Sequence, residues 1–199
     1  MLKKIGLILI STVSLFALHT AELNLNDVDL EIGAKFDIGQ FNESVEPNTM
    51  FFGGKFFTPD KKHSSSSITS LNPYFEANFL IIREFGASGM SLGFGGKFNY
   101  TQLNNEDFYS IPLGVEFGYV IPAPDLIPMS LHGSVYYAPQ VLSFSKAKNY
   151  LEYRINYDIE VIKNVSVTLG YRNMNTEYTN SLGSLNYNDS WYFGFKVGF

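Results

Sequence analysis

The amino-acid sequence predicts an all-β fold, a transmembrane antiparallel up-and-down β-barrel with ten strands favoured and eight possible. Apolar and polar residues alternate in segment after segment, and several segments reach the roughly 9–11 residues that a tilted strand needs to cross a bilayer. Charged residues make up 17% of the 199 residues, against about 25% in a typical soluble domain, while aromatic residues reach 16%. These features together favour a barrel in a membrane over a soluble β-sandwich.

The alternation is clearest over residues 151–161, where every second residue is apolar and every residue between is polar or charged. Residues 30–38, 74–81, 92–100 and 111–119 show the same period of two. Soluble β-sandwiches also alternate, but their strands average about five or six residues. In a barrel that crosses a membrane, the apolar face meets lipid and the polar face lines the lumen.

The strand count depends on two weak segments. Counting from residues 30–38 onward gives an odd number, whereas single-chain bacterial barrels normally have an even number. The short alternating segment 22–26 can supply a first strand and make ten. If residues 49–57 do not span the membrane, the count is eight instead.

The connections fall into two classes that alternate along the chain. The long or polar class comprises residues 58–70, 102–107, 139–149 and 176–184. The shorter class comprises residues 84–89, 121–128 and 163–164, the last suited to a two-residue hairpin turn. Because such barrels have long outer loops and short periplasmic turns, we expect the long class outside. Residues 40–48 fall in the periplasmic class but are long for it.

The N-terminus matches a secretory leader that is removed from the mature protein. Two lysines precede an apolar run over residues 5–18, which is short for a transmembrane anchor. Ala21 can be the last residue of the leader, although His19 then stands where a small residue is usual. We therefore expect a leader over residues 1–21 and a barrel over residues 22–199. The absence of cysteine excludes a lipoprotein.

The last strand is typical of outer-membrane barrels. Trp191, Phe193, Phe195 and Phe199 share one of its faces, and the sequence finishes on that aromatic residue. Such an ending resembles the signal read by the outer-membrane assembly machinery. Physically, it presents an edge strand that can add to the edge of another sheet. With the leader, it predicts a location in the cell outer membrane of a Gram-negative bacterium. The expected partners are the assembly machinery, membrane lipid and lipopolysaccharide, with the oligomeric state left open.

The predicted inward face carries charges of both signs. Its acids are Glu31, Asp37, Glu76, Glu116, Glu152, Asp158 and Glu160, and its bases are Lys35, Lys55, Lys97, Arg154, Arg172 and Lys196. Charges in a narrow, poorly hydrated lumen are costly unless they are paired. Barrels of about eight strands have interiors that side chains can fill, whereas open porins need about sixteen strands. We therefore predict a salt-bridge network across a plugged or barely conducting lumen.

Composition excludes several kinds of site. The net charge of −5, without a basic cluster, argues against a nucleic-acid partner. No cysteine is available for thiolate ligation, and we expect neither a metal nor a cofactor. His63 is a single histidine in a Lys/Ser-rich segment. Gly93, Gly95 and Gly96 lie within a strand with no helix after them, so they do not predict a phosphate loop and more simply make room for bulky lumen neighbours.

One arrangement resembles catalytic machinery. His132 and Ser134 form a His-x-Ser pair, and Glu116 or Glu152 could orient the histidine, as in outer-membrane lipid A deacylases. However, the apolar neighbours of the pair occupy the lipid face, which turns His132 and Ser134 toward the lumen and away from a lipid substrate. We therefore predict no enzyme activity and no catalytic residue.

Three functions are compatible with these sequence features. The leading hypothesis is a small non-enzymatic envelope protein with a charge-filled lumen, which acts structurally or presents its loops outside. The second is a weak porin or small-solute channel. The third is a lipid A-modifying hydrolase.

Three stretches of the second half carry a family resemblance. They are Tyr136-Tyr137-Ala138-Pro139-Gln140-Val141-Leu142-Ser143-Phe144, Tyr150-Leu151-Glu152-Tyr153-Arg154 and Gly170-Tyr171-Arg172-Asn173. They resemble the YfaZ family of predicted outer-membrane proteins, and the similarity extends over essentially the whole mature chain. The family implies a small β-barrel without an established activity, substrate or catalytic residue. It also supports a strand that runs from Tyr136 into an outer loop, where Pro139 ends the hydrogen-bond ladder.

Overall fold

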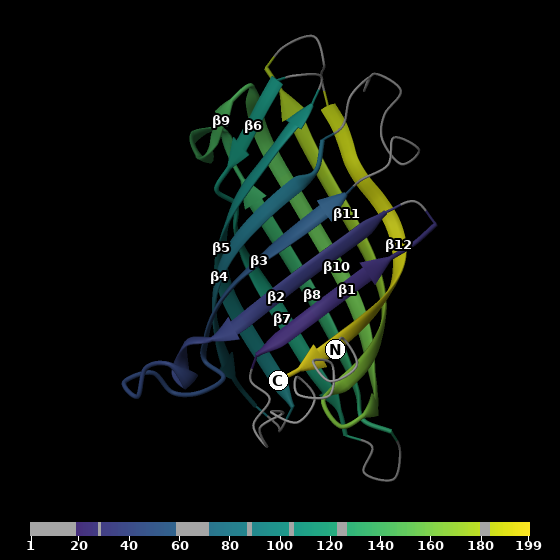
Figure 1. Ribbon diagram of the computed structural model, residues 1–199. Coiled ribbons are helices and arrows are strands. Elements are labelled where there is room, and N and C mark those ends of the chain that lie inside the picture. The colour runs from purple at the N-terminus through teal and green to yellow at the C-terminus, as the bar shows by residue number, and fades with distance from the viewer. Residues whose placement is uncertain are drawn as a thin grey trace, which may run out of the picture.

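The structure, a computed structural model, describes residues 19–27, 29–58, 72–86, 89–103, 106–122, 127–179 and 184–199. The strands of these ranges form one antiparallel sheet that closes on itself (Figure 1). The apolar run of the expected leader and His63 lie outside the described residues.

Ten of the described strands make up the barrel wall. They are β1 (Thr20–Leu25), β2 (Leu30–Asp37), β3 (Met50–Thr58), β4 (Tyr74–Glu84), β5 (Met90–Leu103), β7 (Leu113–Ile121), β8 (Met129–Ala138), β10 (Ala147–Ile162), β11 (Val165–Tyr178) and β12 (Ser184–Gly198). Each pairs with the next, and β1 pairs with β12 to close the ring. The predicted all-β, ten-stranded barrel is thereby confirmed: residues 22–25 belong to the first strand, and β3 is part of the wall.

The barrel has two distinct ends. At the terminal end, β1 begins at Thr20 and β12 ends at Gly198, and these two residues are register partners (Figure 1). At the loop end, β11 ends and β12 begins. Two short strands, β6 (Glu106–Ser110) and β9 (Ser143–Ser145), continue the wall at the loop end by pairing with β5 and with each other. Short 3₁₀ turns follow β2 and β8, namely η1 (Ile38–Gln40) and η3 (Gln140–Leu142).

The alternating pattern puts the apolar face of the wall on its exterior. Large apolar side chains with at least a third of their surface exposed include Leu23, Ile32, Phe52, Phe75, Phe79, Phe94, Phe98, Val115, Leu151, Ile155, Leu169, Phe193 and Phe195. The residues between them are polar and buried, among them Asn24, Glu31, Glu76, Lys97 and Arg154. The polarity is therefore inside out relative to a soluble β protein, in which the apolar face forms the core.

Gly95 of β5 makes room for inward side chains, as the sequence suggested, whereas Gly96, which the sequence grouped with it, faces outward. A Cβ atom on inward-facing Gly95 would lie 2.7 Å from the Tyr136 hydroxyl and 2.8 Å from the Phe79 carbonyl oxygen. A Cβ atom on the outward-facing Gly96 would meet nothing closer than the Leu113 side chain at 3.4 Å. The two adjacent glycines therefore provide a matched pair, because only one of them faces a crowded interior.

We expect Gly95→Ala to destabilise the barrel by about 1–3 kcal/mol, the usual cost of forcing an extra methyl group into a packed site. Gly96→Ala is expected to leave the stability unchanged or to raise it. The folded barrel has space for the added methyl group, and alanine lowers the conformational entropy of the unfolded chain. Urea unfolding in detergent micelles, followed by the fluorescence of the single tryptophan, Trp191, measures both. Equal midpoints for the two variants would contradict this packing.

A cluster of buried apolar and aromatic side chains fills the lumen at the loop end. This aromatic plug consists of Phe57, Tyr74, Phe108, Ala138, Ala147, Tyr150, Met174, Tyr178, Leu185 and Tyr187, with Leu142 packed against it. Three of its tyrosines pair their hydroxyl groups: the oxygens of Tyr74 and Tyr150 lie 2.9 Å apart, and those of Tyr187 and the neighbouring Thr101 lie 3.1 Å apart. The loop end of the barrel is therefore a packed core rather than a water-filled passage.

Candidate functional site

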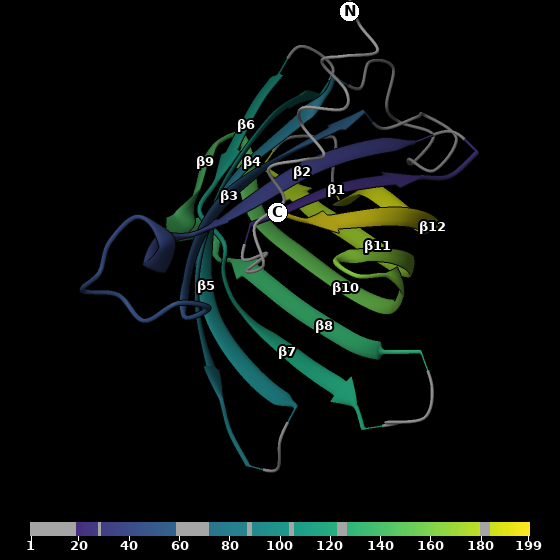
Figure 2. The same ribbon diagram turned by 60° about the horizontal axis from the view of Figure 1, so that its bottom comes forward.

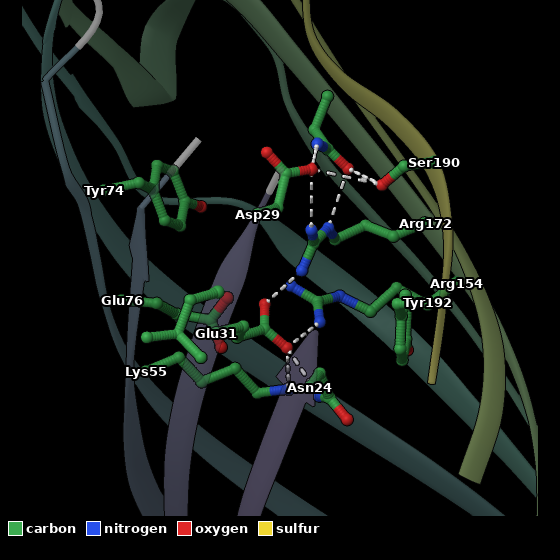
Figure 3. Close-up of polar contacts among 12 residues, drawn as sticks. Asn24, Asp29, Glu31, Lys55, Tyr74, Glu76, Arg154, Arg172, Ser190 and Tyr192 are labelled. Carbon is green, nitrogen blue, oxygen red and sulfur yellow. Dashed lines mark hydrogen bonds and ion pairs between the residues drawn. The ribbon is translucent and has the colours of Figure 1, made fainter. Parts of the chain in front are cut away.

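A buried carboxylate, Glu31 of β2, joins four wall strands in the middle of the lumen (Figure 3). Arg154 of β10 donates from Nη1 to its Oε1 at 2.7 Å, and Arg172 of β11 donates from Nη1 to its Oε2 at 2.8 Å. Asn24 of β1 donates to Oε1 at 2.9 Å. One side chain thus ties together strands that are up to 141 positions apart in the sequence.

A second carboxylate, Glu152, extends the contacts toward the opposite wall. It accepts from Arg154 Nε at 2.5 Å, from Lys97 Nζ at 3.0 Å and from the Tyr150 hydroxyl at 2.9 Å. Lys97 also lies 3.1 Å from Glu76 of β4. The charges are therefore linked from β4 across to β11, with Tyr150 connecting them to the aromatic plug.

We call these residues the ion-pair chain: Glu76, Lys97, Glu152, Arg154, Glu31 and Arg172. Acids and bases alternate along it, and none of its members is more than 6% exposed. Removing an ion from water costs several kcal/mol, which is offset only where the geometry is good and the remaining donors and acceptors are satisfied. The alternation keeps each buried charge in contact with an opposite one.

Arg172 connects the ion-pair chain to the aromatic plug. Its guanidinium carbon lies 3.9 Å from the ring centroid of Phe57, a cation–π contact. Its Nε donates to Asn188 at 2.9 Å, and Asn188 in turn donates to Asp29 at 2.7 Å. Asp29, Ser190 and Arg172 lie together above Glu31 in Figure 3. The ion-pair chain and the aromatic plug therefore pack directly on each other between the middle of the barrel and its loop end.

The other half of the lumen, toward the terminal end, contains a cavity of about 420 Å³. This vestibule is lined by polar side chains that include Lys35, Glu116, His132 and Lys196, and Arg154 of the ion-pair chain reaches its inner surface. The inward-facing side chains of Lys35, Glu116 and His132 keep 34%, 30% and 45% of their surface exposed, so water enters the vestibule. Figure 2 turns this end of the barrel toward the viewer.

The charges of the vestibule are paired as well. Lys55 contacts Glu22 at 2.5 Å, and Lys196 contacts Asp158 at the same distance. Lys35 lies 3.8 Å from Glu116, in the most exposed of these pairs. The lining therefore carries no large excess of either sign that would select one kind of ion.

The structure groups the predicted lumen residues in three ways. Six form the ion-pair chain. Lys35, Lys55, Glu116, Asp158 and Lys196 line the vestibule, and Lys55 also lies 3.7 Å from Glu31 of the ion-pair chain. The remaining two hold turns at the terminal end instead of joining the network.

Asp37 and Glu160 are these two turn residues. Asp37 accepts from the backbone amides of Gly39 at 3.0 Å and Asn48 at 2.8 Å, which fastens both ends of the segment after β2. Glu160 accepts from the backbone amide of Asn164 at 2.9 Å, in the β10–β11 turn. Each lies at a strand end, where a side-chain acceptor satisfies turn amides that have no ladder partner.

Two acids of the site, the half-buried Glu22 and the buried Asp29, were not predicted from the sequence. Glu22 precedes Asn24 by two positions in β1, and Asp29 precedes Glu31 by two. A period of two puts each of them on the same inward face as its neighbour, so the alternation could have found both. They were overlooked because Glu22 stood next to the expected leader and Asp29 in the turn before β2.

His132 does not form a nucleophile–base–acid relay. Its Nε2 lies 3.1 Å from the Ser130 hydroxyl and 3.6 Å from an Asp158 carboxylate oxygen. In such a relay the nucleophile and the acid contact opposite ring nitrogens, whereas here both contact the same one. Ser134 lines the vestibule, but the hydroxyl that contacts the histidine belongs to Ser130.

Comparison with known families identifies the chain. The family model described as YfaZ precursor matches residues 6–199, which is almost the full sequence. The chain belongs to the YfaZ family. Comparison with curated proteins finds none that matches. The resemblance inferred from the three stretches of the second half is therefore confirmed, and it extends over the whole barrel.

The aromatic residues at the end of this YfaZ protein lie on the closing strand. Trp191, Phe193, Phe195 and Phe199 face the exterior and are 42–66% exposed. In the folded barrel β12 is paired on both sides, with β11 and with β1. The aromatic face is thus still accessible from outside, while the backbone edges of the strand are used to close the wall.

Within the described ranges, no helix is long and apolar enough to cross a membrane. The same part of the chain contains no group of three or more histidine, cysteine, aspartate or glutamate side chains that could hold a metal ion.

Proposed function

We propose that this YfaZ protein is a non-enzymatic barrel of the Gram-negative outer membrane whose lumen is closed to solutes. It contributes structurally to the envelope or presents its loop-end segments outside. The observation that carries the proposal is the pair of packed layers, ion-pair chain and aromatic plug, that fill the lumen from its middle to the loop end. A closed lumen leaves the exterior and the loops as the surfaces available for function.

The exterior supports the membrane part of the proposal. Its large apolar side chains would be costly to expose to water, at roughly 25 cal/mol for each Å² of apolar surface. Lipid removes that cost, and a closed barrel leaves no unpaired strand edge inside the bilayer. On this view the partners of the folded protein are membrane lipid and lipopolysaccharide, and the assembly machinery acts on β12 before the ring closes.

The vestibule favours a second candidate, a weak channel for small solutes. It reaches from the terminal end to Arg154, and the ion-pair chain and the plug lie between it and the loop end. A transient rearrangement of these two layers would be needed for passage. The third candidate, a lipid A-modifying hydrolase, has less support because His132 faces the vestibule and lacks a relay geometry.

Fractionation and liposome swelling test the proposal together. We expect the protein in the outer-membrane fraction, with a gel mobility that changes on heating as a stable barrel unfolds. Liposomes that contain it should swell in a disaccharide solution no faster than protein-free liposomes. Swelling at the rate given by an open porin would favour the channel, and a changed lipid A acylation pattern on overexpression would favour the hydrolase.

A further inference from the structure

His19 is part of the barrel wall, although it stands just before β1. Its backbone amide donates to the carbonyl oxygen of Phe199 at 3.1 Å, and its carbonyl oxygen accepts from the Phe199 amide at 2.9 Å. These two hydrogen bonds extend the β1–β12 ladder by one more pair. The seam that closes the barrel therefore begins at His19.

The side chain of His19 is held as specifically as its backbone. Its Nδ1 accepts from the backbone amide of Asp37 at 3.1 Å. Its ring stacks on Phe41, with centroids 5.1 Å apart and planes 8° from parallel, and it lies within 6 Å of the rings of Phe36 and Phe199. The histidine thus joins β2, the segment after it and the final residue of the sequence.

The next two residues belong to the same seam. Thr20 pairs with Gly198 on one side and Lys35 on the other, and Ala21 pairs with Val197 and Ala34. A leader that ended at Ala21 would remove both residues together with His19. β1 has six residues and would keep only four of them, at the one place where the ring closes.

A second leader boundary is compatible with the sequence besides the expected one after Ala21. Ala17 and Ala21 are both small residues that can end a leader. Neither has a small residue two positions earlier, because Leu15 and His19 stand there. The contacts of His19 to Ala21 in the seam favour the earlier boundary.

We propose that the leader is removed after Ala17, so that the mature protein begins at Leu18 and keeps His19, Thr20 and Ala21 in the β1–β12 seam. This boundary lies upstream of the one expected from sequence, after Ala21. It rests on the export that the proposed function includes. Processing there leaves the whole of β1 available to close the ring, whereas processing after Ala21 would discard a third of it.

N-terminal sequencing of the protein purified from outer membranes tests the boundary. The expected sequence begins Leu18-His19-Thr20. A sequence that begins Glu22-Leu23-Asn24, or at any residue other than Leu18, would overturn the proposal. Absence of the protein from the outer-membrane fraction would contradict export itself, and with it the proposed function, so the two failures are distinguishable.

Two matched substitutions provide an independent check, because a bulky residue at the last position of a leader blocks its removal. We expect Ala17→Phe to accumulate as the full-length precursor. Ala21→Phe should be processed at the normal position and fold, since Ala21 faces the barrel exterior between Val197 and Ala34. The reverse pattern, with Ala21→Phe blocked and Ala17→Phe processed, would place the boundary after Ala21 and refute the inference.

Discussion

Replacing Glu31 with glutamine should lower the stability of the barrel by about 3–5 kcal/mol, the usual cost of removing one partner from a buried ion pair. The substitution keeps the size of the side chain but leaves Arg154 and Arg172 facing a neutral amide. Both guanidinium groups are at least 94% buried, so water cannot take the place of the lost charge. Urea unfolding in detergent micelles, followed by Trp191 fluorescence, measures the loss.

Glu116→Gln is the matched control for Glu31. Glu116 is 30% exposed, and its nearest cation, Lys35, lies 3.8 Å away. Exposed pairs of this kind contribute at most about 1 kcal/mol. A glutamine can still accept the 2.7 Å hydrogen bond from Tyr136, so the control isolates the charge. Equal losses of stability in the two variants would show that the buried charge of Glu31 contributes no more than an exposed one. If Glu31→Gln fails to fold at all, the loss of stability is larger still and agrees with the prediction.

Phe57→Ala is expected to have the second large effect, a loss of about 3–5 kcal/mol from the cavity left in a packed core. Phe57 is 1% exposed and belongs to the aromatic plug. Its ring also lies against the Arg172 guanidinium, so the substitution removes one of the contacts that join the plug to the ion-pair chain. The same unfolding measurement applies, and the heating temperature at which the folded gel band disappears provides a second readout.

The neighbouring Phe56 provides the control, because it has the same side chain on the opposite face of β3. Its ring packs against Phe75, with centroids 5.0 Å apart, and Phe75 is 49% exposed on the exterior. Detergent or lipid can replace this packing, so Phe56→Ala should cost only about 1 kcal/mol, the scale of one aromatic pair. If Phe56→Ala were the more destabilising of the two, the plug would not be the core of the barrel.

Much of the fold could be predicted because the period of two is strict in the strands. The alternation placed Glu152 and Arg154 of β10 and Lys196 of β12 on the inward face, where the structure has them. The rule that such barrels have an even number of strands indicated that the short β1 is the first strand. The aromatic plug was harder to foresee. Tyr74 and Tyr150 share the inward face with Glu76 and Glu152, and alternation alone cannot say that tyrosines at the loop end pack together while acids nearer the middle pair with bases.

The sequence predicted a network of paired charges in the lumen, but not which acid pairs with which base. Alternation tells which side chains enter the lumen, whereas partner choice depends on the register between strands that are distant in sequence. Glu31 meets Arg154 and Arg172 only because β1 and β12 close the ring between β2 and β11. The turn roles of Asp37 and Glu160 follow from backbone geometry at strand ends, which the pattern of residues does not encode.

Planar-bilayer recording of the wild-type protein tests the central claim, that the ion-pair chain and the aromatic plug close the lumen. The protein is purified in its folded, heat-modifiable form and added to a bilayer in concentrated salt, under a voltage at which open porins give discrete steps. The account predicts insertion without stable single-channel currents. Stable, large and uniform conductance steps from this folded protein would contradict it.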